Sequence, residues 1–395
     1  MALELKRRGD HRKVDDLSDF DFNYVYLDAM SESLEFRDDT SPKPSTLQAP
    51  TDRQANPNFL HPQKYNSQSS SWTAFGNKDR TLRRGDDLKI ASWNMFFPAP
   101  AAAARTSAAI ACLRTIFGQS PENLVIMFQE LRQESLQAIL EDEWTQQNFV
   151  LSDTEPPCLD ERDEEPAHTP SPYFTLMMIP QNLPICNVFR VPFVSEMRRD
   201  ALVVDIPVSE DNGLRVSKRS LRLCTTHLDS LYTGKELRFH QLMQISALLK
   251  GDWSQGQTIH GGLVGGDMNS VDRSEHNTHR APEVNLKDVW EDEPAPAPPA
   301  LKPFKRDITY GKARGNTWGY QSDSARTRKR LDKFLYTGPI ETFALSECQD
   351  TTGRLGRFGI GLKTKVGLGD VWVSDHFGIY STVYETSSAS VINPS

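Results

Sequence analysis

The chain has 395 residues and a formal net charge of −8, which argues against indiscriminate nucleic-acid binding but is compatible with a local basic groove. When glycine is counted and tyrosine is left out, about 40% of the residues are apolar, below the roughly 45–50% of a compact soluble domain, so unfolded segments are expected beside a folded core. There is no apolar run of the roughly 18 residues that cross a bilayer, no secretory signal at the start, and no CxxC spacing among the five cysteines. These features exclude a disulfide framework and a structural zinc site. They predict an intracellular protein of the nucleus or cytoplasm that does not enter the membrane.

Residues 1–86 are predicted to form a disordered N-terminal tail. The stretch 41–71 is rich in Pro, Ser, Gln and Asn, and no sustained period of 2 or 3.6 appears. Within the tail, DFDFNYVYLDAM alternates acidic and aromatic residues and is a candidate docking segment for a protein partner, with an ordinary acidic patch as the alternative. The cluster KRRGDHRK could be a nuclear import signal, although such clusters are common by chance.

From Leu88 onward, apolar runs alternate with segments of helical composition. Strands are predicted at 88–94, 123–130, 173–179, 200–206, 220–228, 261–269, 330–338 and 371–385, and helices at 101–117 and 236–250. Because strands alternate with helices but also follow one another directly, we expect an α+β domain of mixed sheets over residues 87–386. Residues 387–395 are expected to be a flexible C-terminus. The breaker-rich stretches 152–172 and 291–303 are predicted to be surface insertions without a further role.

Polar side chains recur at or just beyond the ends of these apolar runs. They are Asn94, Glu130, His227, Asp267, Asn269, Asp375 and His376. Such groups are costly deep inside a strand, whereas strand ends can bring them to one rim of a sheet. Carboxylate and amide oxygens favour Mg²⁺ or Mn²⁺, and neighbouring histidines can stabilise negative charge on a phosphate. Each residue alone has an ordinary structural explanation, and their joint occurrence in this order indicates a site.

By these residues the chain resembles the endonuclease/exonuclease/phosphatase superfamily of metal-dependent phosphoesterases. The motifs are SWN (Ser92–Asn94), FQE (Phe128–Glu130), THLDS (Thr226–Ser230), GDMN (ending Asp267–Asn269), RLD (Arg330–Asp332) and SDH (Ser374–His376). The resemblance implies a deoxyribonuclease I-like fold. This is a four-layered α/β sandwich of two mixed β-sheets flanked by helices, with the active site at one edge.

Finer features are similar to the tyrosyl-DNA phosphodiesterase 2 branch, which hydrolyses the bond between a protein tyrosine and a DNA 5′ phosphate. They are the SxMxR stretch (Ser195, Met197, Arg199), Arg238 and Gln241 after THLDS, LKDVWE (Leu286–Glu291), NTWGYQ (Asn316–Gln321) and SDHFGIY. One departure is Phe96, because the branch usually has an aspartate two residues after the asparagine. The way in which this chain holds its metal is therefore in question.

The resemblance also implies a role for each site residue. Metal ligands for Mg²⁺ or Mn²⁺ would be Glu130, Asn94 and Asp375. Catalytic residues would be Asp267, which activates water, His376, which is positioned by Asp332, and the phosphate contacts His227 and Asn269. Substrate-binding residues would be Asn269, Arg199 and Trp318. The implied reaction is phosphodiester hydrolysis by in-line attack of water, carried out by a monomer at DNA ends such as 5′-tyrosyl-DNA adducts in DNA repair.

The sequence leaves alternatives for the identity of the substrate. Residues 302–333 hold ten basic and three acidic residues around Trp318, which suits a single-stranded nucleic-acid end, although a basic loop with Trp318 in the core is the alternative. The same fold could act on a phospholipid, an inositol phosphate or RNA. It could also be a catalytically weak DNA-binding module, against which the intact set Glu130, Asp267, Asn269 and His376 argues.

Overall fold

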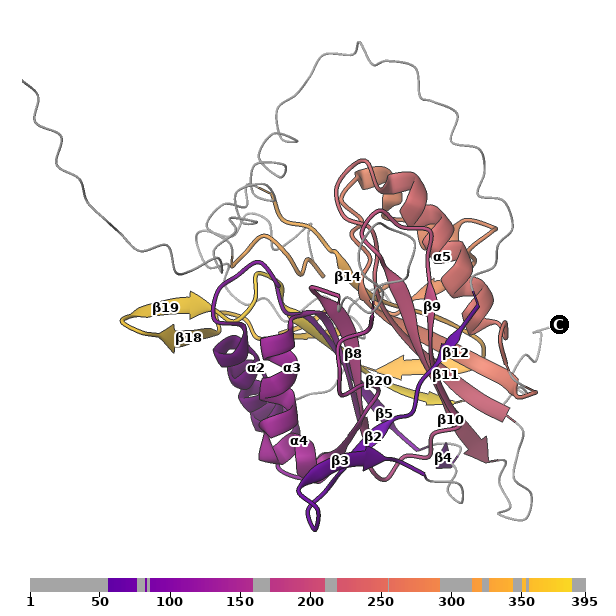
Figure 1. Cartoon of the computed structure of the whole chain (residues 1–395). Coiled ribbons are helices and arrows are strands. Elements are labelled where there is room, and N and C mark those ends of the chain that lie inside the picture. Colours follow the sequence, from indigo (N-terminus) through magenta and orange to yellow (C-terminus); the bar gives the residue numbers. More distant parts are fainter. Residues whose placement is uncertain are drawn as a thin grey trace, which may run out of the picture. The chain divides into compact units, whose positions relative to one another are not determined.

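Two β-sheets carry the candidate site, and their central strands are the apolar runs of the sequence (Figure 1). The computed structural model describes residues 56–76, 82–83, 86–158, 171–209, 219–254, 256–291, 315–321, 327–343, 350–352 and 355–385. All of these residues belong to one compact unit, Thr46–Ser395.

The first sheet has eight strands among the described residues, in the order β1-β9-β10-β11-β12-β14-β13, with β4 beside β10. Their bounds are β1 Asn58–Phe59, β4 Leu82–Arg83, β9 Asn187–Pro192, β10 Asp200–Ser209, β11 Arg219–His227, β12 Thr258–Asp267, β13 Lys287–Asp288 and β14 Asp332–Thr337. Strands β11 and β12 run parallel, whereas β12 and β14 run antiparallel, so the sheet is mixed.

The second sheet has ten strands in the described part of the chain, in the order β16-β17-β20-β5-β6-β8-β7-β2-β3, with β15 beside β20. Their bounds are β2 Gln63–Asn66, β3 Ser71–Ala74, β5 Leu88–Asn94, β6 Leu124–Leu131, β7 Phe149–Leu151, β8 Phe174–Pro180, β15 Ile340–Phe343, β16 Asp350–Thr352, β17 Leu355–Phe358 and β20 Gly378–Glu385. The pair β5 and β6 is parallel, and its neighbours β8 and β20 are antiparallel to it. A separate ribbon pairs β18 (Lys363–Val366) with β19 (Gly369–Trp372).

Helices cover the outer face of each sheet, as Figure 1 shows. Helices α2 (Ala102–Phe117), α3 (Gln133–Glu141) and α4 (Glu143–Asn148) lie against the second sheet, and α5 (Lys235–Leu249) lies against the first. Two short 3₁₀ turns, η1 (Arg273–Glu275) and η2 (Thr278–Arg280), follow β12. No helix in the described ranges combines the length and the apolarity needed to cross a bilayer.

Three apolar clusters hold these layers together. Ile90 and Val125 point between the sheets, and their neighbours Ala91 and Ile126 point toward the helices, as the period-2 alternation of a strand requires. Because the central strands are covered on both faces, apolar residues predominate in their sequences. The predicted α+β fold of two mixed sheets flanked by helices, in four layers, is confirmed.

The N-terminal part of the fold begins earlier than expected. Strand β1 pairs with β9, β2 pairs with β7, and β4 pairs with β10, so the predicted disorder of residues 1–86 does not hold for the described residues 56–76 and 82–83. Leu60 packs on the core between the sheets and Trp72 on the helix-side core, which anchors these short strands. The acidic–aromatic segment, the KRRGDHRK cluster and residues 387–395 lie outside the described residues.

Candidate active site

Strand ends from both sheets bring polar side chains together at one edge. His227 pairs with Asp267, and Asp267 with Asp332, at the ends of the adjacent strands β11, β12 and β14. Asn94 ends β5 in the other sheet, and its Nδ2 donates to Glu130 Oε1 at 3.2 Å and to Asp267 Oδ2 at 3.0 Å. The convergence expected for these residues is therefore present, and Asn94 bridges the two sheets.

Glu130 reaches this edge because β6 is bulged. Along β6, Ile126 and Phe128 face the helix-side core, and a regular strand would send Glu130 the same way. The pairing with β8 shifts register between Phe128 and Leu131, and Glu130 itself has a φ of 57°. A bulge of this kind redirects a side chain. The backbone N–H of Phe97 then donates to Glu130 Oε2 at 2.8 Å and fixes the carboxylate.

Beyond Asp267 the chain turns sharply. A Cβ on Gly266 would lie 2.0 Å from the backbone oxygen of Thr226, so only glycine fits before Asp267. Asn269 has a φ of 47°, and its N–H donates to Asp267 Oδ1 at 2.8 Å. The prediction that Asn269 continues the same extended segment is therefore wrong. Its Nδ2 donates to the Leu228 carbonyl at 2.9 Å, and this bond holds the loop after β11.

His227 is a neutral imidazole with a defined tautomer. Arg199 Nη1 lies 2.9 Å from His227 Nδ1, and because arginine can only donate, the ring hydrogen of His227 must be on Nε2. Burial, followed by the charge of Arg199, lowers the pKa of His227 well below its usual value. Nε2 lies 3.6 Å from Glu130 Oε1 and 3.5 Å from Asp267 Oδ2, so its N–H points into the site.

Arg199 is buried, and both of its terminal nitrogens contact the protein. Besides His227, its Nη2 donates to Ser230 Oγ at 3.2 Å, and its guanidinium carbon lies 4.8 Å from the centre of the Tyr173 ring. Tyr173 in turn stacks on Phe97, with ring centroids 4.4 Å apart. The sequence predicted that Arg199 binds substrate. In the structure Arg199 contacts His227 and is in a position to orient its ring. Tyr173 was not singled out from the sequence, because nothing in the residues around it marks it.

His376 is held in the charged form by its carboxylate neighbours. Its Nδ1 lies 2.7 Å from Asp332 Oδ2, the positioning contact that the resemblance implied. Burial alone would lower the pKa of His376, but Asp332 and then Asp375 outweigh it and raise the pKa well above its usual value. Nε2 lies 3.8 Å from Asp267 Oδ2 and 3.8 Å from Asp375 Oδ1. Trp318 Nε1 donates to the other oxygen of Asp375 at 2.8 Å.

The acidic side chains of the site suit a bound cation. Burial raises the pKa of Asp267 to about 7, and burial also raises the pKa of Glu130 and of Asp375. Oxygens of Glu130 and Asp267, with a histidine nitrogen, lie within 4.8 Å of one another. In the described part of the chain, the buried Oδ1 atoms of Asp332 and Asp375 have no hydrogen-bond partner. Buried carboxylates with unsatisfied oxygens fit a hard divalent cation.

Asn94 is oriented differently from a metal ligand. Its Oδ1 accepts from the Phe96 N–H at 2.9 Å, while its Nδ2 faces the two carboxylates. In this orientation the side chain positions Glu130 and Asp267. Phe96, at the position where the related branch has its aspartate, has a φ of 53° and is half-buried.

Arg105 holds the loop after Asn94. This buried side chain donates to the backbone carbonyls of Met95, Phe96, Ala99, Pro100 and Val373. Val373 precedes the SDH motif, whose Ser374 Oγ donates to the Asn94 carbonyl at 2.6 Å. Arg105 therefore ties the two segments that carry Asn94 and His376. Sequence reasoning missed it, although an arginine in an alanine-rich helix was an available signal.

Arg238 and Gln241 belong to the loop scaffold. Arg238 pairs with Glu275 at 2.6 Å and donates to the Asp229 and Leu231 carbonyls. The side chain of Gln241 is bonded to the Asp229 carboxylate and accepts from its N–H at 3.1 Å. Both residues of α5 thus hold the loop after β11 in shape beside His227.

The predicted basic groove lies only partly in the described residues, since 302–314 and 322–326 fall outside them. Of the described basic residues, Arg330 is buried and pairs with Asp288 at 2.7 Å. Lys333 is also buried, donates to the His276 carbonyl at 3.2 Å, and has a pKa lowered by burial to about 8. These two side chains stabilise the fold and do not contribute to a basic surface.

A small basic and aromatic surface remains around Trp318. The guanidinium of Arg328 lies 4.6 Å from the ring centre of Tyr320, and the ammonium of Lys329 lies 5.1 Å from that of Tyr232. Arg328 and Tyr232 are exposed, and Trp318, which is half-buried, pairs through its backbone with Lys329. The alternative that places Trp318 in the core is not supported.

A family match covers the same part of the chain as these motifs. The model of the endonuclease/exonuclease/phosphatase family matches residues 91–376, well over half of the sequence. The chain belongs to the endonuclease/exonuclease/phosphatase family. A comparison with curated proteins by sequence finds no match.

Solved structures share this family fold at low sequence identity. Truncated TDP2 from Caenorhabditis elegans matches with a TM-score of 0.52 and 16% identity, over 76% of this chain and 98% of that one. An endonuclease/exonuclease/phosphatase family protein from Bacteroides thetaiotaomicron matches with a TM-score of 0.50 and 13% identity, over 76% and 99% of the two chains. The predicted resemblance to the superfamily and, in fold, to TDP2 is confirmed.

Proposed function

We propose that the chain is a divalent-metal-dependent phosphodiesterase that hydrolyses phosphodiesters at DNA ends, such as 5′-tyrosyl-DNA adducts, by direct attack of water. The observation that carries this proposal is the meeting of Glu130, Asp267 and the His376–Asp332 pair at one edge of both sheets. These residue types supply a cation site, a base and a positive charge, which are the groups that the reaction needs.

The cation would be held by Glu130, with Asp375 supporting it from the C-terminal segment. When bound, Mg²⁺ or Mn²⁺ supplies Lewis-acid polarisation of a phosphate oxygen. The unsatisfied oxygen of Asp375 and the raised pKa of Glu130, caused by burial and then by Asp375, support this assignment.

Asp267 is the group that accepts the proton of the attacking water. Its two oxygens are oriented by the Asn269 N–H and by Asn94 Nδ2, at 2.8 and 3.0 Å. A carboxylate whose pKa burial raises to about 7 is well matched to a base that operates near neutral pH.

His227 and His376 stabilise the negative charge that develops on the phosphate. His227 presents a neutral N–H at Nε2, and His376 presents a charged one at Nε2. Preorganised donors of this kind in a buried site need no reorganisation during the reaction.

The DNA-end part of the proposal is supported by the surface around Trp318. Arg328 and Lys329 lie over tyrosine rings, and Trp318, which pairs with Lys329, donates to Asp375. This combination suits the phosphates and stacked bases of a single strand.

The test compares the full chain with Asp267→Asn and with Asp370→Asn, a matched exposed control on β19. The assay offers 5′-tyrosyl DNA, abasic DNA, RNA and an inositol phosphate in the presence of Mg²⁺. We expect 5′-tyrosyl DNA to be cleaved fastest and Asp267→Asn to lower kcat by about 10²–10⁴-fold without changing oligonucleotide binding. Loss of binding together with cleavage would assign Asp267 a structural or metal-holding role. Preference for the inositol phosphate would contradict the DNA substrate.

A further inference from the structure

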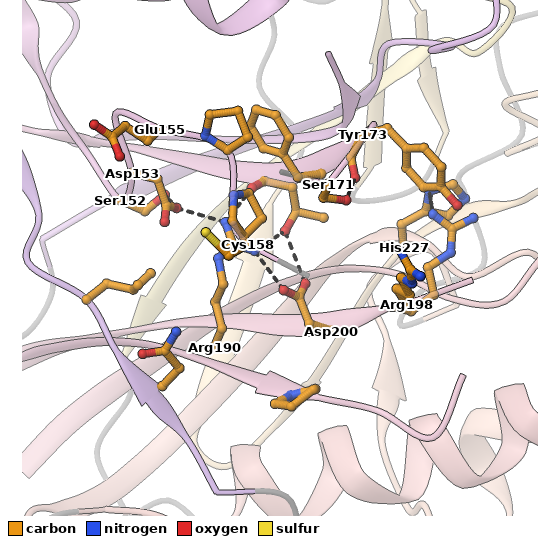
Figure 2. A pocket seen from close by; sticks show the side chains of 18 of the residues that line it. Ser152, Asp153, Glu155, Cys158, Ser171, Tyr173, Arg190, Arg198, Asp200 and His227 are labelled. Atoms are coloured by element: carbon orange, nitrogen blue, oxygen red, sulfur yellow. Dashed lines mark hydrogen bonds and ion pairs between the residues drawn. The ribbon is translucent and has the colours of Figure 1, made fainter. Parts of the chain in front are cut away.

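A cavity of about 830 Å³ leads from the candidate active site toward the N-terminal strands. Glu130 and His227 line one end, and Asn58 of β1 lies on its rim. Figure 2 shows His227, Arg198 and Tyr173 at one end of the cavity, with Arg190 between Asp153 and Asp200 at the other. This volume matches that of a ligand pocket and far exceeds what one phosphate needs, so it can take a substituent of the substrate.

The charges at the far end do not suit further phosphates. Arg190 Nη2 lies 2.8 Å from Asp153 Oδ2, and Nη1 lies 2.8 Å from Asp200 Oδ2. Two carboxylates thus offset one guanidinium there, and the exposed Glu155 adds a further negative charge at the rim. A nucleic-acid strand that reached this far end would meet net negative charge among the described residues, in contrast to the basic surface at Trp318.

The cavity also offers hydrogen-bond donors and apolar walls. Arg198, which is exposed, and Thr154, which is half-buried, line the cavity with side chains that can donate hydrogen bonds. Such donors can pair with an acceptor such as a carbonyl oxygen of the occupant. Tyr173, Phe193 and Pro157 provide apolar surface beside them. A peptide, with carbonyl groups between apolar side chains, matches this combination.

We propose that this cavity binds the peptide part of a peptide–DNA adduct, on the leaving side of the scissile phosphorus. The DNA strand then lies along Trp318 and Lys329, on the other side of the site. This inference rests on the proposed phosphodiesterase function. It makes β1 and the loop after β7 the determinants of specificity for the adducted protein.

Adjacent residues of β1 give a matched pair of variants. Asn58 is exposed and lines the cavity, so Asn58→Trp obstructs the rim. Phe59 does not line it, and its ring contacts that of Phe189 with centroids 5.3 Å apart, so Phe59→Trp is the control. Glu155→Trp obstructs the cavity from the loop after β7 and serves if Asn58→Trp does not fold.

The assay uses one oligonucleotide with three 5′ groups, namely p-nitrophenyl, tyrosine and a pentapeptide with a central tyrosine. With Mg²⁺ and the full chain, we expect KM to fall about tenfold from the tyrosine to the pentapeptide substrate, since two further hydrogen bonds form. Asn58→Trp should raise KM for the pentapeptide substrate to the value for the tyrosine substrate and leave kcat unchanged. For the p-nitrophenyl and tyrosine substrates, both KM and kcat should stay at their wild-type values. Phe59→Trp should behave as the wild type.

Equal KM values for tyrosine and pentapeptide in the wild-type protein would overturn the peptide site. The peptide site is also overturned if obstruction of the cavity weakens binding of longer oligonucleotides and leaves the peptide effect intact, because the occupant is then nucleic acid. If the wild-type protein does not cleave the p-nitrophenyl substrate, the proposed function itself fails and the inference falls with it. Cleavage of that substrate without a peptide effect refutes the inference alone.

Discussion

Replacing Arg105 with methionine is expected to destabilise the domain and impair the site together. The guanidinium donates to five backbone carbonyls, four in the loop after Asn94 and one at Val373. Methionine fills similar space but offers no donor, so the loop loses its connection to the SDH segment. The Phe97 N–H, which holds Glu130, is part of the same loop.

The size of the effect follows from opposing contributions. A hydrogen bond from a charged donor contributes about 1.5–3 kcal/mol, so five would nominally exceed about 7 kcal/mol. Burial of the charge offsets part of this sum, as its lowering of the pKa of Arg105 to about 10 indicates. Phe96, Ala99 and Pro100 are also partly exposed, so their carbonyls regain water. We expect the free energy of unfolding to fall by about 3–5 kcal/mol, which lowers the Tm of a domain of roughly 300 residues by about 5–8 °C.

Thermal denaturation followed by circular dichroism measures this change, and Mg²⁺-dependent cleavage well below Tm measures the effect on the site. Arg105→Lys, which keeps the charge and three donors, should lie between the wild type and Arg105→Met in both assays. Arg114→Met, on the last turn of the same helix and half-buried, is the control and should leave both unchanged. A wild-type Tm and rate for Arg105→Met would refute the reasoning, because other contacts would then order the loop.

Three further predictions concern the metal site and the N-terminal strands. Glu130→Gln should lower turnover at least about 100-fold in a Mg²⁺ titration, and wild-type turnover would contradict a role in metal binding. The Tm of this variant should stay the same or rise, because burial disfavours the charged form of Glu130. Phe96→Asp should lower the half-saturating Mg²⁺ concentration, because aspartate tolerates a φ of 53° and adds a carboxylate; an unchanged midpoint in a folded variant would mean that this side chain does not reach the site. Deletion of residues 1–55 should leave Tm and kcat unchanged, whereas deletion of residues 1–76 should lower Tm because β1, β2 and β3 are lost. Equal Tm values for the two truncated proteins would show that these strands add no stability.

The central strands could be predicted closely because their burial on both faces makes them continuous apolar runs. Strand β5 has the bounds read from LKIASWN, and β6 differs from its prediction by a single residue at each end. The edge strands β1 to β4 could not be predicted, since they have two to four residues each and too few apolar positions to show a period. Their anchors Leu60 and Trp72 are single apolar residues in a polar segment.

The candidate site was predictable in its residue types and in its position at the strand ends. The backbone features that orient these side chains were not predictable. The bulge at Glu130 and the turn at Asn269 depend on how neighbouring strands pair. The same limit applies to Arg199 and Arg105, whose partners lie in distant segments. An arginine in a sequence carries a charge, but only the fold decides whether that charge meets substrate or holds a loop.

The contacts that complete the site join the two ends of the folded part of the chain. The Trp93 indole donates to the His376 carbonyl across 283 residues of sequence, and Ser374 donates to Asn94 across 280. Contacts of such high sequence separation require a long loop to close, and this closure slows folding. During synthesis, a ribosome-bound chain carries Asn94 and Glu130 long before His376 emerges. Strand β20, which pairs with β5, and the segment Ser374–His376 therefore complete the site only after nearly the whole chain has been made. Under the proposed function, a chain interrupted before Ser374 would lack His376 and would not hydrolyse its substrate.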